Sequence, residues 1–226
     1  ENNNIYISST YNGIIKDDVS INVGFSYSSN EDDRFLTYKP VDEEELNLDI
    51  ASNDNLYQIR SVFSKKLFSN SILRYGIHLF DQHNEYSQFD SLYQKEEKII
   101  DEFMMTGFFE LDMKLSRTIA FRLGGRLESS ELLNKSNAAP RFSFAYKLGR
   151  FDQMSYAYGK FYQTPDLGFD QWYREVGAAY DISNMNLDFE SSTHHILNYQ
   201  WVKNNRVFRV ELYDKEYNNL IRIDDD

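Results

Sequence analysis

The sequence predicts an all-β fold, specifically an antiparallel transmembrane β-barrel segment of about ten strands with short periplasmic turns and long extracellular loops. Apolar and polar residues alternate along many segments. In residues 19–27 the odd-numbered side chains are apolar, and the even-numbered ones are Ser, Asn or Gly. Successive side chains of a strand point to opposite faces, so each segment has one apolar and one polar face. No run of eighteen apolar residues is present, which excludes a helical membrane protein.

The alternation places the expected strands, in chain order, at residues 5–12, 19–28, 56–65, 72–86, 104–114, 119–131, 141–148, 153–162, 193–201 and 207–217. Many of these are nine residues or longer, which is enough to cross a bilayer when tilted. Residues 99–115 also fit a helical stripe. A strand is favoured there because Met105, Phe109 and Leu111 alternate with polar residues. In residues 141–148 all the aromatic side chains fall on one face, and both cations fall on the other.

The connections between these strands alternate in length. Short turns are expected at residues 16–18, 65–71, 116–117, 149–152 and 203–205, and long loops at 28–55, 81–98, 129–139 and 161–191. Outer-membrane barrels show this order, with short periplasmic turns and longer loops outside. A soluble barrel or sandwich gives the same residue alternation, but nothing forces this order of connections on it.

The face opposite the apolar one carries charged side chains. Its members are Arg60, Arg74, His78, Arg122, Arg126, Glu128, Arg141, Lys147, Arg209, Glu211 and Lys215. A lipid-facing Arg or Lys at the bilayer midplane costs about 2–4 kcal/mol, so these positions are expected to face the lumen. The alternative is the solvated outer face of a soluble sheet. That sheet would need a cover on its apolar face, and no segment makes a confident amphipathic helix.

Composition excludes several classes of protein. Without cysteine, neither a disulfide framework nor a thiolate metal site can form, and the net charge of −12 argues against a nucleic-acid partner. Aromatic residues make up 16% of the chain. They suit the two interfacial girdles of a membrane barrel, although Tyr-rich sheets occur in soluble proteins. Glu1 does not begin a signal peptide, so either such a peptide has been removed or the chain starts inside a longer one.

The histidines offer little support for catalysis. Asp81 and His83 lie where a strand would leave the membrane, and a rim-site hydrolase would need such a carboxylate and base. Barrel rims are rich in Asp, Ser and His, so we expect no catalytic residues and no enzyme activity. His194 and His195 point to opposite faces of a strand and cannot bind one metal together.

Two groups of residues are candidates for binding. Calcium prefers carboxylate and carbonyl oxygens, so an acidic extracellular loop could bind Ca²⁺ through Asp42, Glu43, Glu45 and Asp49. A solvated charge run is the default for this segment, and no other cofactor is expected. An aromatic rim could contact a ligand through Tyr158, Phe161, Tyr162, Trp172, Tyr173 and Tyr180.

Two stretches of the sequence carry a family resemblance. Residues 137–146 (NAAPRFSFAY) and 155–165 (SYAYGKFYQTP), followed by residues 193–201 and 206–220, resemble the barrel of TonB-dependent outer-membrane receptors, in particular the Bacteroidetes type. The resemblance is good over residues 137–221 and generic before them. Receptors of this family close 22 strands around an N-terminal plug. The resemblance therefore implies that residues 1–226 are a partial barrel domain without the plug and the remaining strands.

The resemblance implies energised uptake of a scarce nutrient across the outer membrane of a Gram-negative bacterium. Siderophore, glycan and peptide ligands all remain open. Expected partners are outer-membrane lipid, the nutrient, a surface lipoprotein, and the TonB energy-coupling protein acting through the absent N-terminal part. The alternative function is a barrel without transport, such as an adhesin, a scaffold subunit or a rim-site hydrolase.

Overall fold

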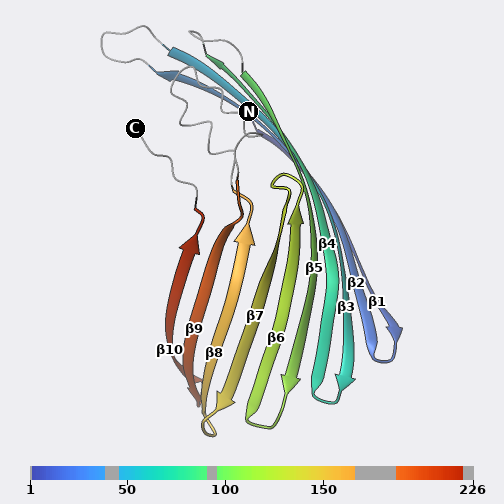
Figure 1. Ribbon diagram of the computed structural model, residues 1–226, viewed down its shortest axis with the longest axis vertical. Coiled ribbons are helices and arrows are strands. Elements are labelled where there is room, and N and C mark those ends of the chain that lie inside the picture. Colours follow the sequence, from blue (N-terminus) through green and yellow to red (C-terminus); the bar gives the residue numbers. More distant parts are fainter. Residues whose placement is uncertain (1, 39–45, 91–95, 166–186, 221–226) are drawn as a thin grey trace.

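Ten strands form one antiparallel sheet in the computed structural model, which describes residues 2–38, 46–90, 96–165 and 187–220 (Figure 1). Each strand pairs with the next one in the chain, and the sheet bends into an open wall with β1 and β10 at its edges. The strands are β1 (Asn2–Lys16), β2 (Val19–Tyr38), β3 (Leu46–Phe68), β4 (Ser71–Asp90), β5 (Glu96–Lys114), β6 (Ile119–Ser130), β7 (Lys135–Lys147), β8 (Asp152–Gln163), β9 (Glu190–Lys203) and β10 (Arg206–Asn218). The ten predicted strands are confirmed, including the choice of strand over helix for β5.

Tight turns close the hairpins at one end of the sheet, which we name the turn end. Asn204 and Asn205 join β9 to β10 with φ values of 49° and 58°. Asn tolerates this left-handed conformation, and positive φ at both central residues is the requirement of a type I′ hairpin turn. Between β5 and β6, the Ser116 hydroxyl accepts hydrogen bonds from the backbone N–H groups of Thr118 (3.1 Å) and Ile119 (3.0 Å). The short turns predicted from the sequence are confirmed.

The opposite end, named the loop end, differs from the sequence prediction. Much of the expected loop at residues 28–55 is strand, because β2 continues to Tyr38 and β3 begins at Leu46. The expected loop at 81–98 likewise belongs largely to β4 and β5, and the one at 129–139 shrinks to a turn at residues 131–134. Residues 29–34, 52–55 and 81–85 of these extensions are polar throughout, so sequence alternation does not mark them, although their backbone groups pair across the ladder. At the start of β3 the prediction missed a short alternation, in which Leu46, Leu48 and Ile50 are the apolar residues.

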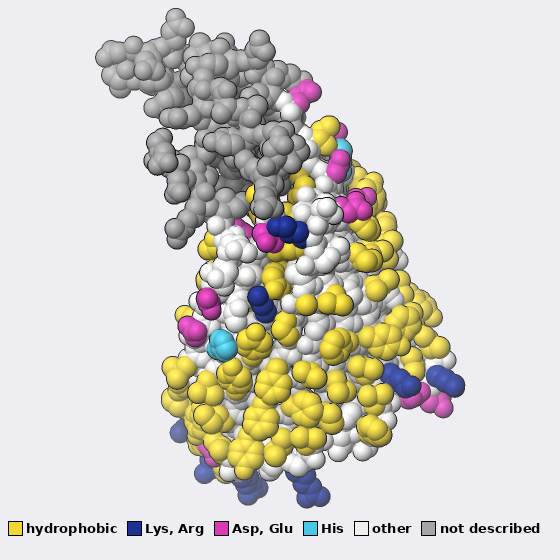
Figure 2. All heavy atoms as spheres, in the orientation of Figure 1, with side chains coloured by type: hydrophobic (Ala, Val, Ile, Leu, Met, Phe, Trp, Pro, Cys, Tyr) yellow, Lys and Arg dark blue, Asp and Glu magenta, His cyan; other side chains and the backbone are white. Residues whose placement is uncertain are grey.

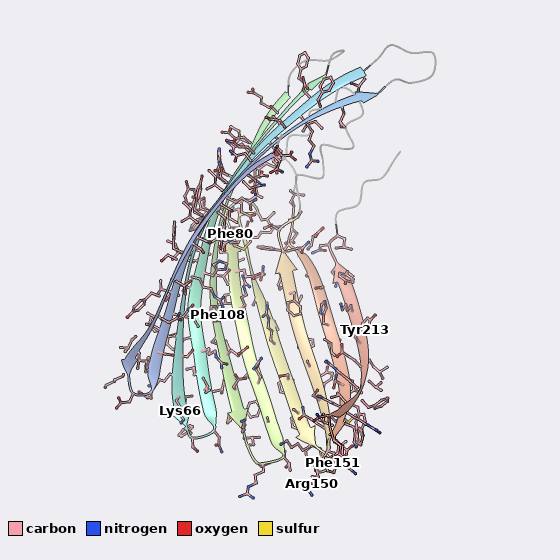
Figure 3. The ribbon with its side chains drawn as sticks, turned by 180° about the vertical axis from the view of Figure 1, so that it is seen from behind. Lys66, Phe80, Phe108, Arg150, Phe151 and Tyr213 are labelled. Carbon is pink, nitrogen blue, oxygen red and sulfur yellow. The ribbon has the colours of Figure 1, made fainter. Side chains whose placement is uncertain are left out.

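The pairing register sorts the side chains into two faces. The charged residues predicted to share a face do so, and the face lines a hollow of about 650 Å³, so we name it the inner face. Phe80, Phe108 and Tyr213 also belong to it, and Figure 3 shows them from this side.

The other face, named the outer face, is apolar near the turn end. One continuous row crosses the sheet from β10 to β5 through Leu212, Leu197, Tyr156, Phe144, Phe121 and Met113. Hydrophobic side chains gather over the half of this face nearest the turns (Figure 2). They are open to the surroundings, and Phe109 and Phe208 are 49% and 57% exposed. A soluble sheet would bury such a surface, whereas a membrane barrel presents it to lipid.

The buried hydrophobic cluster lies near the loop end instead of along the wall. It contains Met104, Leu133 and Phe189, with Phe80, Tyr162 and Leu187 packed against it. Among the described residues, no helix has the length and apolar character needed to cross a membrane.

Candidate functional site

The structure describes three of the six aromatic residues predicted to contact a ligand, and these three lie on both faces of β8. Phe161 lies on the inner face, because it shares that side of β8 with Gly159. Tyr158 lies on the outer face, where it pairs with Phe142 and His195 and its ring centroid is 5.2 Å from that of His195. Tyr162 packs against Phe189, with 6.1 Å between ring centroids. Trp172, Tyr173 and Tyr180 lie outside the described residues.

A buried carboxylate on β5 holds the segment that follows β8. The Thr164 hydroxyl donates a hydrogen bond of 3.2 Å to one Glu102 oxygen, and Ser130 donates another of 3.2 Å to the second oxygen. Ser130 also accepts a hydrogen bond of 3.2 Å from the backbone N–H of Leu133. Glu102 thereby ties three parts of the chain together across the inner side of β6 and β7.

Further contacts hold the residues that precede β9. Phe189 is 2% exposed and packs into the cluster with Met104 and Leu133. Lys135 forms an ion pair of 3.3 Å with Asp188, and the Asn219 amide donates a hydrogen bond of 3.4 Å to the Phe189 carbonyl. Both described ends of the connection between β8 and β9 therefore fold onto the wall. We name Glu102, Ser130, Thr164, Asp188 and Phe189 the rim clamp.

Burial has an electrostatic consequence at this clamp. Glu102 is 8% exposed, and burial raises the pKa of its carboxyl. The hydrogen bonds from Ser130 and Thr164 favour the ionised form and offset part of that rise. A carboxyl placed in this way can respond to pH at the mouth of the barrel. No local sequence pattern indicates the clamp, because Glu102 and Thr164 meet only in the folded sheet.

A ladder of ion pairs covers the middle of the inner face. Arg74 of β4 contacts Asp112 and lies 3.2 Å from Glu110, and Arg122 of β6 binds the same Asp112. Close to this ladder, Arg126 lies against Glu128 as a charge contact without hydrogen-bond alignment, and its Nη2 donates to the Thr106 hydroxyl at 3.2 Å. Paired charges of this kind suit a polar lumen and would be costly on a lipid-facing surface.

The arrangement of His83 does not support a rim-site hydrolase. His83 lies on the outer face, where its Nδ1 contacts Asp101 and its Nε2 lies 3.0 Å from Glu85. A carboxylate therefore faces each ring nitrogen, which favours the protonated imidazole. Hydrogen bonds from Glu85 and Asp101 accordingly raise the pKa of His83. A general base needs a free ring nitrogen, which this contact pattern removes.

Two metal-site predictions have different outcomes. His194 shares the inner face with Gly159, whereas His195 lies on the outer face beside Tyr158, as predicted for a pair that cannot bind one metal. Asp42, Glu43 and Glu45 of the calcium prediction lie outside the described residues, and Asp49 sits on β3 opposite Phe35 and Phe89. Within the described ranges, no group of three His, Asp or Glu side chains is placed to bind a metal.

Comparison with protein families gives a match over the whole chain. Residues 1–226 match the model of the TonB dependent receptor-like β-barrel. No curated protein sequence matches this one.

Solved structures with the same fold are much longer. The ferric citrate transporter FecA in its unliganded form has a TM-score of 0.71 and 9% identity, covering 96% of this chain and 35% of FecA. The ferric yersiniabactin uptake receptor FyuA from Yersinia pestis has a TM-score of 0.68 and 11% identity, covering 96% and 35%. The RagAB peptide importer in its closed-closed state has a TM-score of 0.64 and 10% identity, covering 97% and 30%. The chain thus spans about a third of their length.

Proposed function

The chain belongs to the TonB-dependent receptor family, whose members are transporters and not enzymes, and we propose that it forms part of the wall and mouth of an outer-membrane receptor for energised nutrient uptake. In this proposal the outer face contacts lipid, the inner face lines the lumen, the turn end is periplasmic and the loop end is extracellular. TonB supplies energy through a part of the receptor other than these strands. A surface lipoprotein partner at the loop end is a further element of the proposal.

The observation that carries the proposal is the contrast between the two faces of one sheet. The outer face has exposed apolar rows, and the inner face has the Arg74, Asp112 and Arg122 ladder at the same level of the wall. Lipid on one side and a polar lumen on the other would satisfy both faces. The rim clamp supports a role at the mouth of the receptor, because Glu102 of the inner face holds Thr164 at the loop end.

The names of the structural neighbours suggest which ligand classes to test first. FecA and FyuA are described as ferric citrate and ferric yersiniabactin receptors, and RagAB as a peptide importer. A small chelate or a peptide is therefore the proposed cargo, and a glycan stays open.

The proposal is tested in cells that make the whole receptor. Uptake of iron chelates and of peptide mixtures is measured with and without a protonophore that collapses the energy of the inner membrane. We expect receptor-dependent uptake that stops with the protonophore. Receptor-dependent uptake that continues in de-energised cells would contradict an energised mechanism, and absence of receptor-dependent uptake of every class would favour an adhesin or scaffold.

A further inference from the structure

A small hollow opens on the inner face where β6, β7, β8 and β9 meet. Its volume is about 230 Å³, and its lining includes Glu110, Arg122, Arg141, Phe161 and His194. Glu110 is already paired, since it lies 3.2 Å from Arg74 and 3.6 Å from Arg122. Small residues from neighbouring strands form the floor, namely Gly124, Ser143, Ala157 and Gly159. We name it the Arg141 hollow.

Glycines on both sides keep the space beside Arg141 open. Arg141 pairs with Gly124 of β6 and with Gly159 of β8. A Cβ at Gly124 would lie 3.0 Å from the Phe109 carbonyl oxygen, and a Cβ at Gly159 would lie 2.9 Å from the Phe161 ring. A side chain at either position would displace a neighbour. Because both positions are glycine, no side chain flanks Arg141 in the row of paired residues that crosses β6, β7 and β8.

The guanidinium of Arg141 is oriented but not neutralised. Its Cζ lies 4.7 Å from the centroid of the Phe161 ring, and this ring also lies 4.9 Å from that of His194. A guanidinium held against a ring keeps the N–H donors in its plane available for another partner. Among the residues that the structure describes, no carboxylate pairs with Arg141, whereas Arg74, Arg122, Arg126 and Arg209 each have one.

The row that crosses the sheet through Arg141 carries a second permanent cation. From β7 to β10 it runs through Arg141, Gly159, His194 and Lys215 and contains no carboxylate, whereas Glu110, on the other side of Gly124, already pairs with Arg74. The chain as a whole has a net charge of −12. Two cations in one row of an acidic protein favour an anion at this part of the wall.

We propose that the Arg141 hollow binds a carboxylate of the imported ligand. The proposal rests on the uptake function and names a chemical group that the ligand carries. The planar fork of an arginine binds a carboxylate through two parallel N–H···O bonds, and Phe161 fixes the plane in which that fork lies. Phe161 is three residues before Thr164 of the rim clamp, so the hollow lies just inside the mouth, where a ligand that passes the clamp arrives.

The test uses the whole receptor purified in detergent and para-bromobenzoate as the carboxylate probe. Calorimetry measures affinity, and anomalous diffraction from crystals grown with the probe locates the bromine. We expect a bromine peak in the hollow and a loss of affinity of roughly tenfold to a hundredfold in Arg141→Gln, since a hydrogen-bonded charged pair is removed. Arg141→Lys, which keeps the charge without the fork, should give an intermediate affinity.

Arg209→Gln is the matched control, because this inner-face arginine already pairs with Glu211 at 2.6 Å, and its affinity for the probe should equal that of the unmodified receptor. Heat-modifiable gel mobility verifies that each variant is folded. Equal affinity in Arg141→Gln and the unmodified receptor would overturn the proposal. So would a carboxylate from elsewhere in the receptor occupying Arg141 with no bromine peak there. Binding in detergent needs no energised membrane, so absence of probe binding to the unmodified receptor, with its energised uptake intact, would refute the hollow alone.

Discussion

Thr164, just beyond the end of β8, donates a hydrogen bond of 3.2 Å to Glu102 of β5, although 62 residues separate them in the chain. The two strands are not neighbours in the sheet, since β6 and β7 lie between them. The bond therefore crosses the inner side of the wall and sets where the connection after β8 begins its path. Ser130 binds the other oxygen of the same carboxylate, so one side chain holds both this connection and the turn between β6 and β7.

Loss of the Thr164 hydroxyl should loosen the rim clamp. Thr164→Val keeps the shape of the side chain but leaves one Glu102 oxygen without its donor, and a buried group left unsatisfied costs about 1–3 kcal/mol. We expect faster hydrogen exchange in residues 187–189 of the whole receptor, with the strands near the turn end unchanged. Thr118→Val, at the turn end, is the control. Unchanged exchange at 187–189 in Thr164→Val would show that the bond does not hold the connection.

The clamp should also respond to pH. Burial raises the pKa of Glu102 above its usual value of 4.5, so the folded clamp keeps its proton to a higher pH than the unfolded chain does. This contribution to stability is present at low pH and is lost as the pH rises through the raised pKa. Protection factors at residues 187–189 should fall across that window and become independent of pH in Glu102→Gln. A pH dependence that survives in Glu102→Gln would assign the titration to another group.

Two adjacent residues of β7 test which face meets lipid. Phe144 belongs to the outer row with Phe121 and Tyr156, and Ala145 lies on the inner face between Ala120 and Ser155. Phe144→Arg should destabilise the barrel by about 2–4 kcal/mol, the cost of a lipid-facing arginine near the bilayer midplane, and Ala145→Arg by much less. Heat-modifiable mobility and chemical denaturation measure the difference. Equal tolerance of arginine at both positions would contradict the assignment of faces.

Asp112 should contribute more to stability than Glu211. Asp112 binds both Arg74 and Arg122, so Asp112→Asn leaves the two arginines to share Glu110 as their remaining carboxylate and should cost about 1–3 kcal/mol. Glu211 pairs with Arg209 and accepts a hydrogen bond from Asn198, and the two side chains of the ion pair are 38% and 61% exposed, so its removal should cost less than the removal of Asp112. Unfolding of the two variants in denaturant gives the comparison, and the reverse ranking would show that the ladder is not the stabilising network of the wall.

The strands near the turn end could be predicted from the sequence because each has one face in an apolar environment and one in a polar environment. In β7, for example, Phe142 and Phe144 alternate with Arg141 and Ser143, and this alternation predicted the strand. The strand extensions toward the loop end could not be predicted, since in Asn53, Asp54 and Asn55 both faces are polar and the alternation disappears. The rim clamp could not be predicted from the sequence for a different reason. Glu102 sits in an apolar run beside Phe103 and Met104, and only the tertiary fold brings Thr164 to it.

The proposed function requires that the sheet crosses the outer membrane with its turn end in the periplasm and its loop end outside. Labelling near the two ends of β2 tests this orientation. The 226 residues contain no cysteine, so single cysteines can be introduced by Asp17→Cys at the turn end and by Phe35→Cys at the loop end, where Phe35 is 65% exposed. An impermeant maleimide should label Phe35→Cys in intact cells and should label Asp17→Cys only after the outer membrane is permeabilised. Labelling of Asp17→Cys but not Phe35→Cys in intact cells would invert the barrel, and equal labelling of both would show that the sheet does not cross the membrane.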